Sequence, residues 1–242
     1  MMAILKTLGK KKSKMTLAPH HEVERYPNPP VSRCFSQPSP FLPHLDQQSR
    51  FLVADHLEMI HEQLPKRLGL CDWTLIYSTY LHGMTLTTLY YKMQQYQGAS
   101  VLVMQDTEGS IFGAFASEMI HQDPHFYGNG ECFLFRLEPR RTVFPWSRLN
   151  DFFIYSSNEA LAFGGGIQYA LSPPAPPSCA QTTHFLFSFF SSSRGSFGLW
   201  IDSDFNRGNS TRSDTFGNAT LSTKPDFICR GIEVWGFTER VD

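Results

Sequence analysis

Cys132 is the thiol best placed for chemistry in this sequence, because it follows Glu131 in one dense motif, Phe126-Tyr127-Gly128-Asn129-Gly130-Glu131-Cys132-Phe133-Leu134-Phe135. The thiolate is the reactive form of cysteine, and a neighbouring carboxylate raises the pKa of a thiol instead of lowering it. A cysteine in an apolar strand is more often buried and inert. Direct scavenging of oxidants by Cys132 or Glu131 is therefore an alternative function and not the favoured one.

Other reactive arrangements have less support. No Ser-His-Asp or Cys-His arrangement can be argued from the spacing. His56 and His61 are five residues apart on an expected helix, so they do not share a face as an i, i+4 pair of metal ligands would. Asp202-Ser203-Asp204 resembles a cation loop, but alternating acids after a strand more often cap backbone amides. We expect no metal, no cofactor and no catalytic residue.

Charge and cysteine content narrow the class of protein further. The formal net charge is −1 over 242 residues, without the excess of Lys and Arg that a nucleic-acid binder needs. The five cysteines are scattered and include no C-x-x-C pair, which favours reduced thiols in an intracellular protein. The N-terminus lacks the apolar core of a secretory signal, and Phe185 to Phe190 is too short to span a bilayer. These features predict a soluble, cytoplasmic protein.

The motif around Cys132 is itself a turn that leads into a strand. Gly128 and Gly130 permit a close backbone approach, and the two-residue period of a strand places Phe133 and Phe135 on one face, with Cys132 and Leu134 on the other. We expect Glu131 to hydrogen-bond neighbouring loop amides. The glycine run Gly164-Gly165-Gly166 is the expected partner of this turn across the fold.

The elements around the motif are mostly strands. Residues 1–45 combine a lysine cluster with a Pro- and Ser-rich stretch and are predicted to be a disordered tail. Contact with acidic lipids or an import signal is the alternative for the lysines, and a mitochondrial presequence is disfavoured because such segments are usually rich in Arg. Order is expected to begin near Asp55, which forms a capping-box-like pair with Glu58 at the start of a helix that Pro65 ends.

A second helix, ended by Gly98, carries Leu86, Leu89, Tyr90 and Met93 on one face. The segments 101–104 and 111–115 form the clearest hairpin and are apolar on both faces, as in strands covered on each side. Further strands are expected at the following positions: 73–79, 143–146, 152–155, 197–201 and 232–237.

Several motifs in a fixed order carry a resemblance to a known family. They are Trp73 to Thr79, His82-Gly83, Leu89-Tyr90, Ile111 to Phe115, Phe126 to Phe135, Gly164-Gly165-Gly166, Phe197 to Asp202, and Glu233 to Phe237. Together they resemble the TLDc domain of the oxidation-resistance proteins over residues 50–238. The resemblance implies a mainly β fold with flanking helices (α+β), an antiparallel β-sandwich of the TLDc type.

The resemblance also implies a function. TLDc proteins protect cells from oxidative stress and bind the vacuolar proton-pumping ATPase, with no established catalytic residues. For this chain it implies a non-catalytic interaction module whose partners are subunits of that pump, acting in the cytoplasm or at endolysosomal or vacuolar membranes through peripheral association with the pump. The motif residues that the resemblance marks as structural or interface positions are Phe126, Tyr127, Gly128, Gly130, Glu131, Gly164, Gly165, Gly166, Asp202 and Asp204.

The sequence departs from the family pattern in places. The mild departures are Asn129 for Thr, Tyr91 for a basic residue, Pro145-Trp146-Ser147 for Lys-Trp-Thr, and Ser213 for Cys. The severe one is an insertion at 167–194, where the family passes almost directly from the glycine run to Phe-Gly-Leu-Trp.

We hypothesise that residues 167–194 are a translated intron. Their Phe-, Leu- and Ser-rich run is what a polypyrimidine tract encodes, and Gly166-Ile167 and Ser193-Arg194 can hold GT and AG dinucleotides. Transcripts of relatives that carry the segment as a genuine exon would contradict this, and an ordinary surface insertion is the alternative. Closing the longer loop costs only about 2 kcal/mol, so we expect the fold to survive, while the uncharged Phe-rich run promotes aggregation.

Overall fold

The computed structural model describes residues 42–166 and 196–240, in which strands outnumber helices. The helices are α1 (Ala54–His61), the 3-10 turn η1 (Lys66–Leu68), α2 (Thr79–His82) and α3 (Leu86–Tyr96). The strands are β1 (Asp72–Ser78), β2 (Ser100–Asp106), β3 (Ile111–Ala116), β4 (Asp123–Tyr127), β5 (Phe133–Glu138), β6 (Thr142–Pro145), β7 (Ile154–Ser156), β8 (Ala160–Phe163), β9 (Leu199–Asp202), β10 (Arg207–Asn209) and β11 (Asp226–Thr238). The expected mainly β fold with flanking helices is confirmed.

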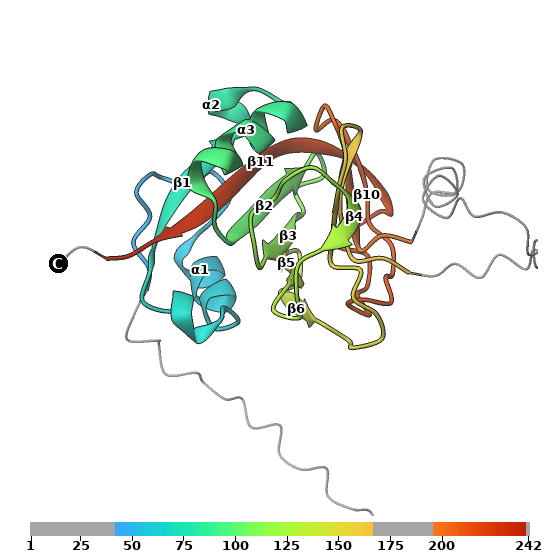
Figure 1. The fold of residues 1–242 in the computed structure, drawn as a ribbon, viewed down its shortest axis with the longest axis horizontal. Coiled ribbons are helices and arrows are strands. Elements are labelled where there is room, and N and C mark those ends of the chain that lie inside the picture. Colours follow the sequence, from blue (N-terminus) through green and yellow to red (C-terminus); the bar gives the residue numbers. More distant parts are fainter. Residues whose placement is uncertain (1–41, 167–195, 241–242) are drawn as a thin grey trace, which may run out of the picture. The chain divides into compact units, whose positions relative to one another are not determined.

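The long strand β11 joins two antiparallel sheets and crosses the whole domain (Figure 1). Sheet A has the order β1-β11-β2-β3-β5-β6. Sheet B has the order β4-β7-β8-β9-β10-β11. The register shifts between Cys229 and Gly231, so β11 changes partners at a bulge.

Sheet A is covered on both faces, as its doubly apolar strands predict. Leu102 and Met104 belong to a core between the two sheets that also includes α3 residues. Val101 and Val103 belong to a second core, with Ile60 of α1. Figure 1 shows α1 on one side of β11 and α2 with α3 on the other. The layers are therefore α1, sheet A, and sheet B together with α3, and no described helix covers the outer face of sheet B.

The start of α1 differs from the expected capping box. Val53 occupies the N-cap position and makes no side-chain cap, while Asp55 pairs with Arg141. The segment before α1 is held instead by the buried Glu233 of β11, whose carboxylate accepts hydrogen bonds from Ser49 Oγ at 2.6 Å and Arg50 N at 2.9 Å. A long-range contact therefore places this helix, and ordered pairing begins earlier than expected, with Leu45 bridged to Trp73.

The end of α3 also differs by one residue. Gln97, with φ 57°, is the left-handed residue that closes the helix, in place of Gly98. Gly98 is needed for space, because a Cβ there would lie 2.7 Å from the Tyr96 ring. The Tyr96 hydroxyl in turn bonds the backbone of Phe237 in β11. Gln97 thus takes the helix-ending position that the sequence suggested for Gly98.

Candidate functional site

The turn between β4 and β5 has two glycines that the packing requires. Gly128 has φ 94°, and a Cβ there would lie 3.2 Å from both Phe153 Cβ and Ile154 Cδ1. A Cβ on Gly130 would lie 2.4 Å from the ring of Trp146. Trp146 is fixed by a 2.7 Å hydrogen bond from its Nε1 to the Asn150 carbonyl. The motif turn therefore packs directly against the Trp146 ring, which this hydrogen bond holds in position.

The amides of this turn are held by Asn129 and Ser117. Ser117 Oγ accepts from Asn129 N at 3.1 Å, and Asn129 Oδ1 accepts from Glu131 N at 2.9 Å. The Asn129 carbonyl accepts from Cys132 N at 3.0 Å. Asn129, which departs from the family pattern, thus accepts hydrogen bonds from the loop amides, the role that we expected of Glu131.

The expectation that Glu131 bonds loop amides is wrong. Its carboxylate points outward and forms a two-pronged ion pair with the Arg67 guanidinium of η1. The hydrogen bonds from Arg67 hold the pKa of the Glu131 carboxyl below its usual value. Both side chains are substantially exposed, so the pair is screened by solvent and contributes little to stability.

Cys132 is a buried thiol in a neutral setting. It is 1% exposed, it faces the core between the sheets, and its Sγ lies 3.3 Å from Ser117 Oγ. Burial raises the pKa of this thiol, as expected, but the carboxylate that adds to the rise is Glu118 and not Glu131. At neutral pH the group is therefore a protonated thiol without access to solvent.

Phe126 and Tyr127 point to different partners. The Phe126 ring stacks on Phe152 at 4.8 Å between centroids, on the outside of sheet B. The Tyr127 hydroxyl turns inward, where it donates to the His121 carbonyl at 3.0 Å and shares a 2.8 Å hydrogen bond with Ser156. Burial raises the pKa of Tyr127 to about 12, so the phenol stays protonated.

The glycine run meets the motif through Phe126. A Cβ on Gly165 would lie 3.3 Å from Phe126 Cζ, and one on Gly164 would lie 2.5 Å from the Phe216 ring. The Gly165 amide donates to Thr215 Oγ1 at 2.9 Å, which itself donates to Asn150 Oδ1 at 2.6 Å. Gly166 lies next to Ser196, with 3.2 Å between the Ser196 Cβ and a Cβ built on Gly166. The insertion at 167–194 lies outside the described residues. The described residues that flank it, Gly166 and Ser196, lie next to each other.

Asp202 and Asp204 do not join the motif turn. Asp202 ends β9, and its carboxylate accepts from Asn206 N at 2.8 Å and Arg207 N at 3.1 Å. Asp204 is exposed in the turn that follows. Asp202 thus caps the amides of a turn, in agreement with the favoured interpretation. The described residues contain no group of three His, Cys, Asp or Glu side chains that could hold a metal ion.

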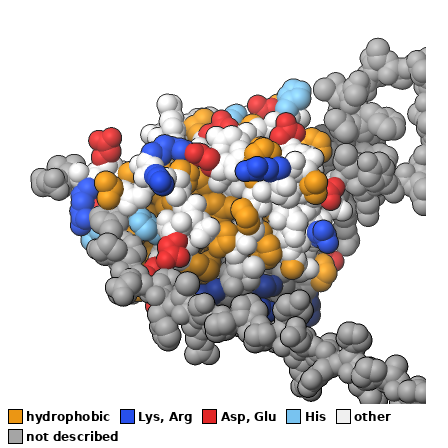
Figure 2. Space-filling view, turned by 90° about the horizontal axis from the view of Figure 1, so that it is seen from below, with side chains coloured by type: hydrophobic (Ala, Val, Ile, Leu, Met, Phe, Trp, Pro, Cys, Tyr) orange, Lys and Arg blue, Asp and Glu red, His pale blue; other side chains and the backbone are white. Residues whose placement is uncertain are grey.

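A small hollow of about 220 Å³ lies beside the motif turn, between the segment after α1 and strands β5 and β6. Pro65, Phe133, Val143 and Pro145 line it together with Glu131. Figure 2 views the domain from below and shows hydrophobic side chains across the middle of that face, with charged side chains around them. No pair of potential acid and base groups converges in this hollow among the residues that the structure describes.

Sequence reasoning missed Arg67, Ser117 and Thr215, because their partners lie far away along the chain. It also missed a larger groove on the outer face of sheet B, lined by Tyr155 and Trp200. The strand Leu199–Asp202 alternates buried and half-buried residues, so its two-residue period could have marked Trp200 as an outward-facing aromatic residue.

Comparisons with known proteins agree with the motifs. A family model described as the TLDc domain matches residues 45–238. Oxidation resistance protein 1 of Xenopus tropicalis is 39% identical over 201 residues, which is 83% of this chain and 20% of that protein. The Homo sapiens protein of the same name is 38% identical over 197 residues, 81% of this chain and 20% of that protein. Nuclear receptor coactivator 7 of Gallus gallus is 36% identical over 196 residues, 81% of this chain and 19% of that protein.

This chain thus spans about a fifth of the length of these curated relatives.

Proposed function

The chain belongs to the TLDc domain family, and from this premise we propose that it is a non-catalytic interaction module that contributes to resistance against oxidative stress. Its proposed partner is the vacuolar proton-pumping ATPase, which it binds and regulates. The relatives named oxidation resistance protein support the stress-related part of this proposal. The pump is the partner that the family resemblance implies.

The observation that carries the proposal is how the two candidate reactive groups are used. The Cys132 thiol is 1% exposed with a raised pKa, and the Glu131 carboxylate is engaged by Arg67. A scavenger needs a thiolate that oxidants can reach. The states of Cys132 and Glu131 therefore support a function by surface binding and not by thiol chemistry.

The proposed place of action is the cytoplasm, at endolysosomal or vacuolar membranes that carry the pump. None of the described helices is long and apolar enough to cross a bilayer. Under this proposal the chain reaches the membrane by binding pump subunits.

Partner capture tests the proposal. The full chain, carrying an affinity tag, is incubated with detergent-solubilised endolysosomal membranes, and captured proteins are quantified against an unrelated tagged protein of similar size. We expect subunits of the proton pump to be enriched. Recovery equal to that of the control protein, with the bait folded and present in equal amount, would contradict the proposal.

Peroxide consumption separates this function from the thiol alternative. Purified chain and the Cys132→Ser variant are mixed with hydrogen peroxide and the remaining peroxide is followed. We expect the same slow loss with both proteins. A rapid loss that disappears in the serine variant would establish a scavenger.

A further inference from the structure

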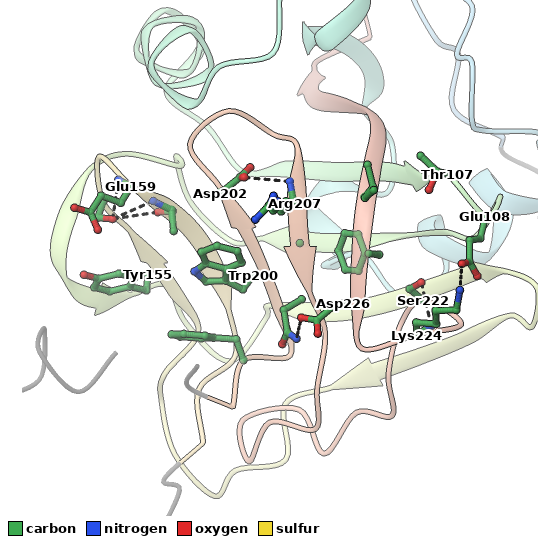
Figure 3. A pocket seen from close by; sticks show the side chains of 17 residues that line it. Thr107, Glu108, Tyr155, Glu159, Trp200, Asp202, Arg207, Ser222, Lys224 and Asp226 are labelled. Atoms are coloured by element: carbon green, nitrogen blue, oxygen red, sulfur yellow. Dashed lines mark hydrogen bonds and ion pairs between the residues drawn. The ribbon is translucent and has the colours of Figure 1, made fainter. Parts of the chain in front are cut away.

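The groove on the outer face of sheet B, with a volume of about 890 Å³, has partners within the domain for three of its four carboxylates (Figure 3). Glu108 pairs with Lys224, and Asp226 Oδ1 accepts a 2.9 Å hydrogen bond from Asn209 Nδ2. The Asp202 carboxylate accepts from backbone amides of the turn after β9. A surface whose charged groups lack such partners is found instead around α2.

The helix α2 and the turn after it carry a cluster of exposed apolar side chains. Tyr80, Leu81 and Met84 are 43%, 62% and 40% exposed and lie within five residues of the chain. Single apolar residues are normal on a protein surface, whereas a contiguous cluster marks an interaction site. Figure 1 shows α2 at the upper edge of the domain, on the other side of β11 from α1. We call these three residues the α2 cluster.

The backbone that carries the α2 cluster is held in place. Ser78 Oγ caps α2 by accepting from Tyr80 N at 3.3 Å. The Tyr77 hydroxyl donates to the Gly83 carbonyl just after the helix. Because both ends of α2 are tied to the domain, little conformational freedom is lost when the cluster binds a surface.

Two cations lie beside the aromatic member of the cluster. The Arg50 guanidinium lies over the Tyr80 ring, with 4.2 Å between its Cζ and the ring centroid. Arg230 is exposed in β11 immediately before Gly231, and a Cβ on Gly231 would lie 2.8 Å from Tyr80 Cε2. The backbone of β11 at Arg230 is therefore close to the same ring.

A third cation, Lys92 of α3, lies near His82 of α2. Burial lowers the pKa of His82, and the charge of Lys92 lowers it further. None of the described residues gives an ion-pair partner to Arg50, Lys92 or Arg230, which we call the three cations. Their charge is therefore available to an anionic ligand.

Two acids have contacts that place them near α2. Glu233 is buried, and its carboxylate accepts from the Arg50 amide at 2.9 Å, so it does not face outward. Asp204 is exposed in the turn after β9, which meets the start of α3 through a 2.8 Å hydrogen bond from Leu86 N to the Ser203 carbonyl. The outward surface described around α2 thus presents three cations and one acid.

This combination fits the surface of an anionic bilayer. Apolar side chains enter the boundary between head groups and acyl chains, Tyr lies at head-group level, and Lys and Arg are attracted to anionic lipids. The whole chain has a net charge of −1, so the attraction is local, because charges more than about 8 Å apart are largely screened. A protein partner would need a matching hollow, whereas a bilayer accepts protruding side chains without one.

We propose that the domain docks on anionic lipid bilayers through α2, with the α2 cluster in the head-group boundary and the three cations on anionic head groups. This goes beyond the proposed function, because it gives the domain a contact with the bilayer itself. It does not require the proton pump.

Sedimentation with vesicles tests the proposal. The full chain is mixed with vesicles of phosphatidylcholine alone or with about 30% phosphatidylserine, and the bound fraction is measured against lipid concentration. We expect at least about tenfold tighter binding to the anionic vesicles, weakened by high salt. No sedimentation with either vesicle, or equal affinity for both, would overturn the proposal.

A leucine variant tests the apolar contact. Leu81→Gln is expected to weaken binding to the anionic vesicles about tenfold, because an apolar side chain is lost from the head-group boundary. Leu70→Gln is the matched control, since Leu70 is also exposed and lies before the other end of β1. It is expected to bind as the wild type does. Equal losses in the two variants would overturn the assignment to α2.

A charge variant tests the three cations. Replacing all three by Gln is expected to weaken binding about a hundredfold, since each cation near an anionic surface contributes about fivefold. The matched control removes the same net charge at exposed cations elsewhere, namely Lys66→Gln, Arg148→Gln and Arg212→Gln. It is expected to bind as the wild type does. Equal losses would show a general attraction of charge and overturn the proposal.

The lysines at positions 6, 10, 11, 12 and 14 are an alternative lipid contact and need their own control. A variant with Gln at these five positions is expected to keep the effect of Leu81→Gln. Binding that is lost in this variant and unchanged in Leu81→Gln would overturn the proposal. Thermal midpoints check that each variant is folded. Because the vesicles contain no pump, a failure here and a failure of pump capture can be told apart.

Discussion

Two glutamates of this domain, Glu233 and Glu131, are used in opposite ways. Glu233 is 2% exposed, and its carboxylate accepts from Ser49, from the Arg50 amide, and from Trp235 Nε1 at 3.2 Å. Glu131 is exposed and pairs with Arg67 alone through its side chain. The buried group lies outside the dense motif that first attracts attention, yet it anchors the segment that precedes α1. The sequence shows the glutamate but not its burial, because Ser49 and Arg50, which bond its carboxylate, lie more than 180 residues away.

Replacement of Glu233 should therefore cost much more stability than replacement of Glu131. Glu233→Gln keeps the side-chain shape but removes a charged acceptor of several buried donors, and we expect a loss of about 2–3 kcal/mol in the free energy of unfolding. Glu131→Gln, the matched control, is expected to lose less than about 1 kcal/mol. Equilibrium urea unfolding measures both. Equal losses would contradict this account of the two residues.

The Arg67–Glu131 pair predicts a specific pH dependence. Arg67 lowers the pKa of Glu131 in the folded chain below its usual 4.5, so the stabilisation is present above that pH and is lost as the pH falls through the lowered value. The stability difference between wild type and Arg67→Ala is thus expected to be present at pH 7, at most about 1 kcal/mol, and absent in strong acid. Urea unfolding across this pH range checks it. A difference that grows as the pH falls would contradict the ion pair.

The described thiols should differ in reactivity. Cys132 and Cys229 are buried, and burial raises the pKa of Cys229 to about 12, whereas Cys71 is only partly buried. Alkylation of the native chain with iodoacetamide at pH 8, mapped by peptide mass spectrometry, is expected to label Cys71 well before the other two. Addition of urea is expected to equalise the rates. Rapid native labelling of Cys132 would favour the scavenger function instead.

At the scale of secondary structure, sequence patterns predicted the elements whose neighbours are close in the chain. The β2–β3 hairpin and the buried face of α3 follow directly from apolar spacing. The patterns failed where distant contacts decide. Glu233 places the start of α1, and the hydrogen bond from the Tyr96 hydroxyl to Phe237 of β11 holds the Tyr96 ring beside Gly98. The strand β11 begins at Asp226, six residues before the apolar run that suggested it, because its first half pairs with short β10.

The close pairing of β2 and β3 makes Gly113 a sensitive position. A Cβ at this residue would lie 1.9 Å from the Leu102 carbonyl oxygen, and a backbone atom cannot move away as a flexible side chain can. Gly113→Ala is expected to destabilise the domain by about 3 kcal/mol or more. Gly69→Ala, where the nearest atom is 3.3 Å away, is the control and should change stability little. Thermal unfolding compares them, and equal midpoints would contradict the packing described for these strands.

At the scale of the whole molecule, the resemblance in sequence motifs predicted the sandwich but not the groove on the outer face of sheet B. Trp200, Arg207 and Asp226 come from three strands, and β10 was not expected from the sequence. Their common face follows from the sheet register, which no local pattern determines. The described residues on either side of the insertion, Gly166 and Ser196, lie next to each other although 29 residues separate them in the sequence.

The proximity of Gly166 and Ser196 predicts that the insertion is dispensable for folding. A variant lacking residues 167–194 joins Gly166 to Gly195, and the short connection suits the adjacent strands β8 and β9. We expect the variant to keep its fold, to gain up to about 2 kcal/mol from the smaller loop, and to give more soluble protein. Circular dichroism, urea unfolding and soluble yield provide the measurements. Loss of the β-sheet spectrum, or equal soluble yield, would count against this account.

We propose that this TLDc chain protects through binding and not through its motif thiol. The most direct measurement is survival after peroxide challenge of cells that lack the endogenous protein and express either the wild-type chain or Cys132→Ser at equal abundance. The buried, protonated state of Cys132 predicts equal protection by both. Protection by the wild type that falls to the level of cells without either chain in the serine variant would contradict the claim.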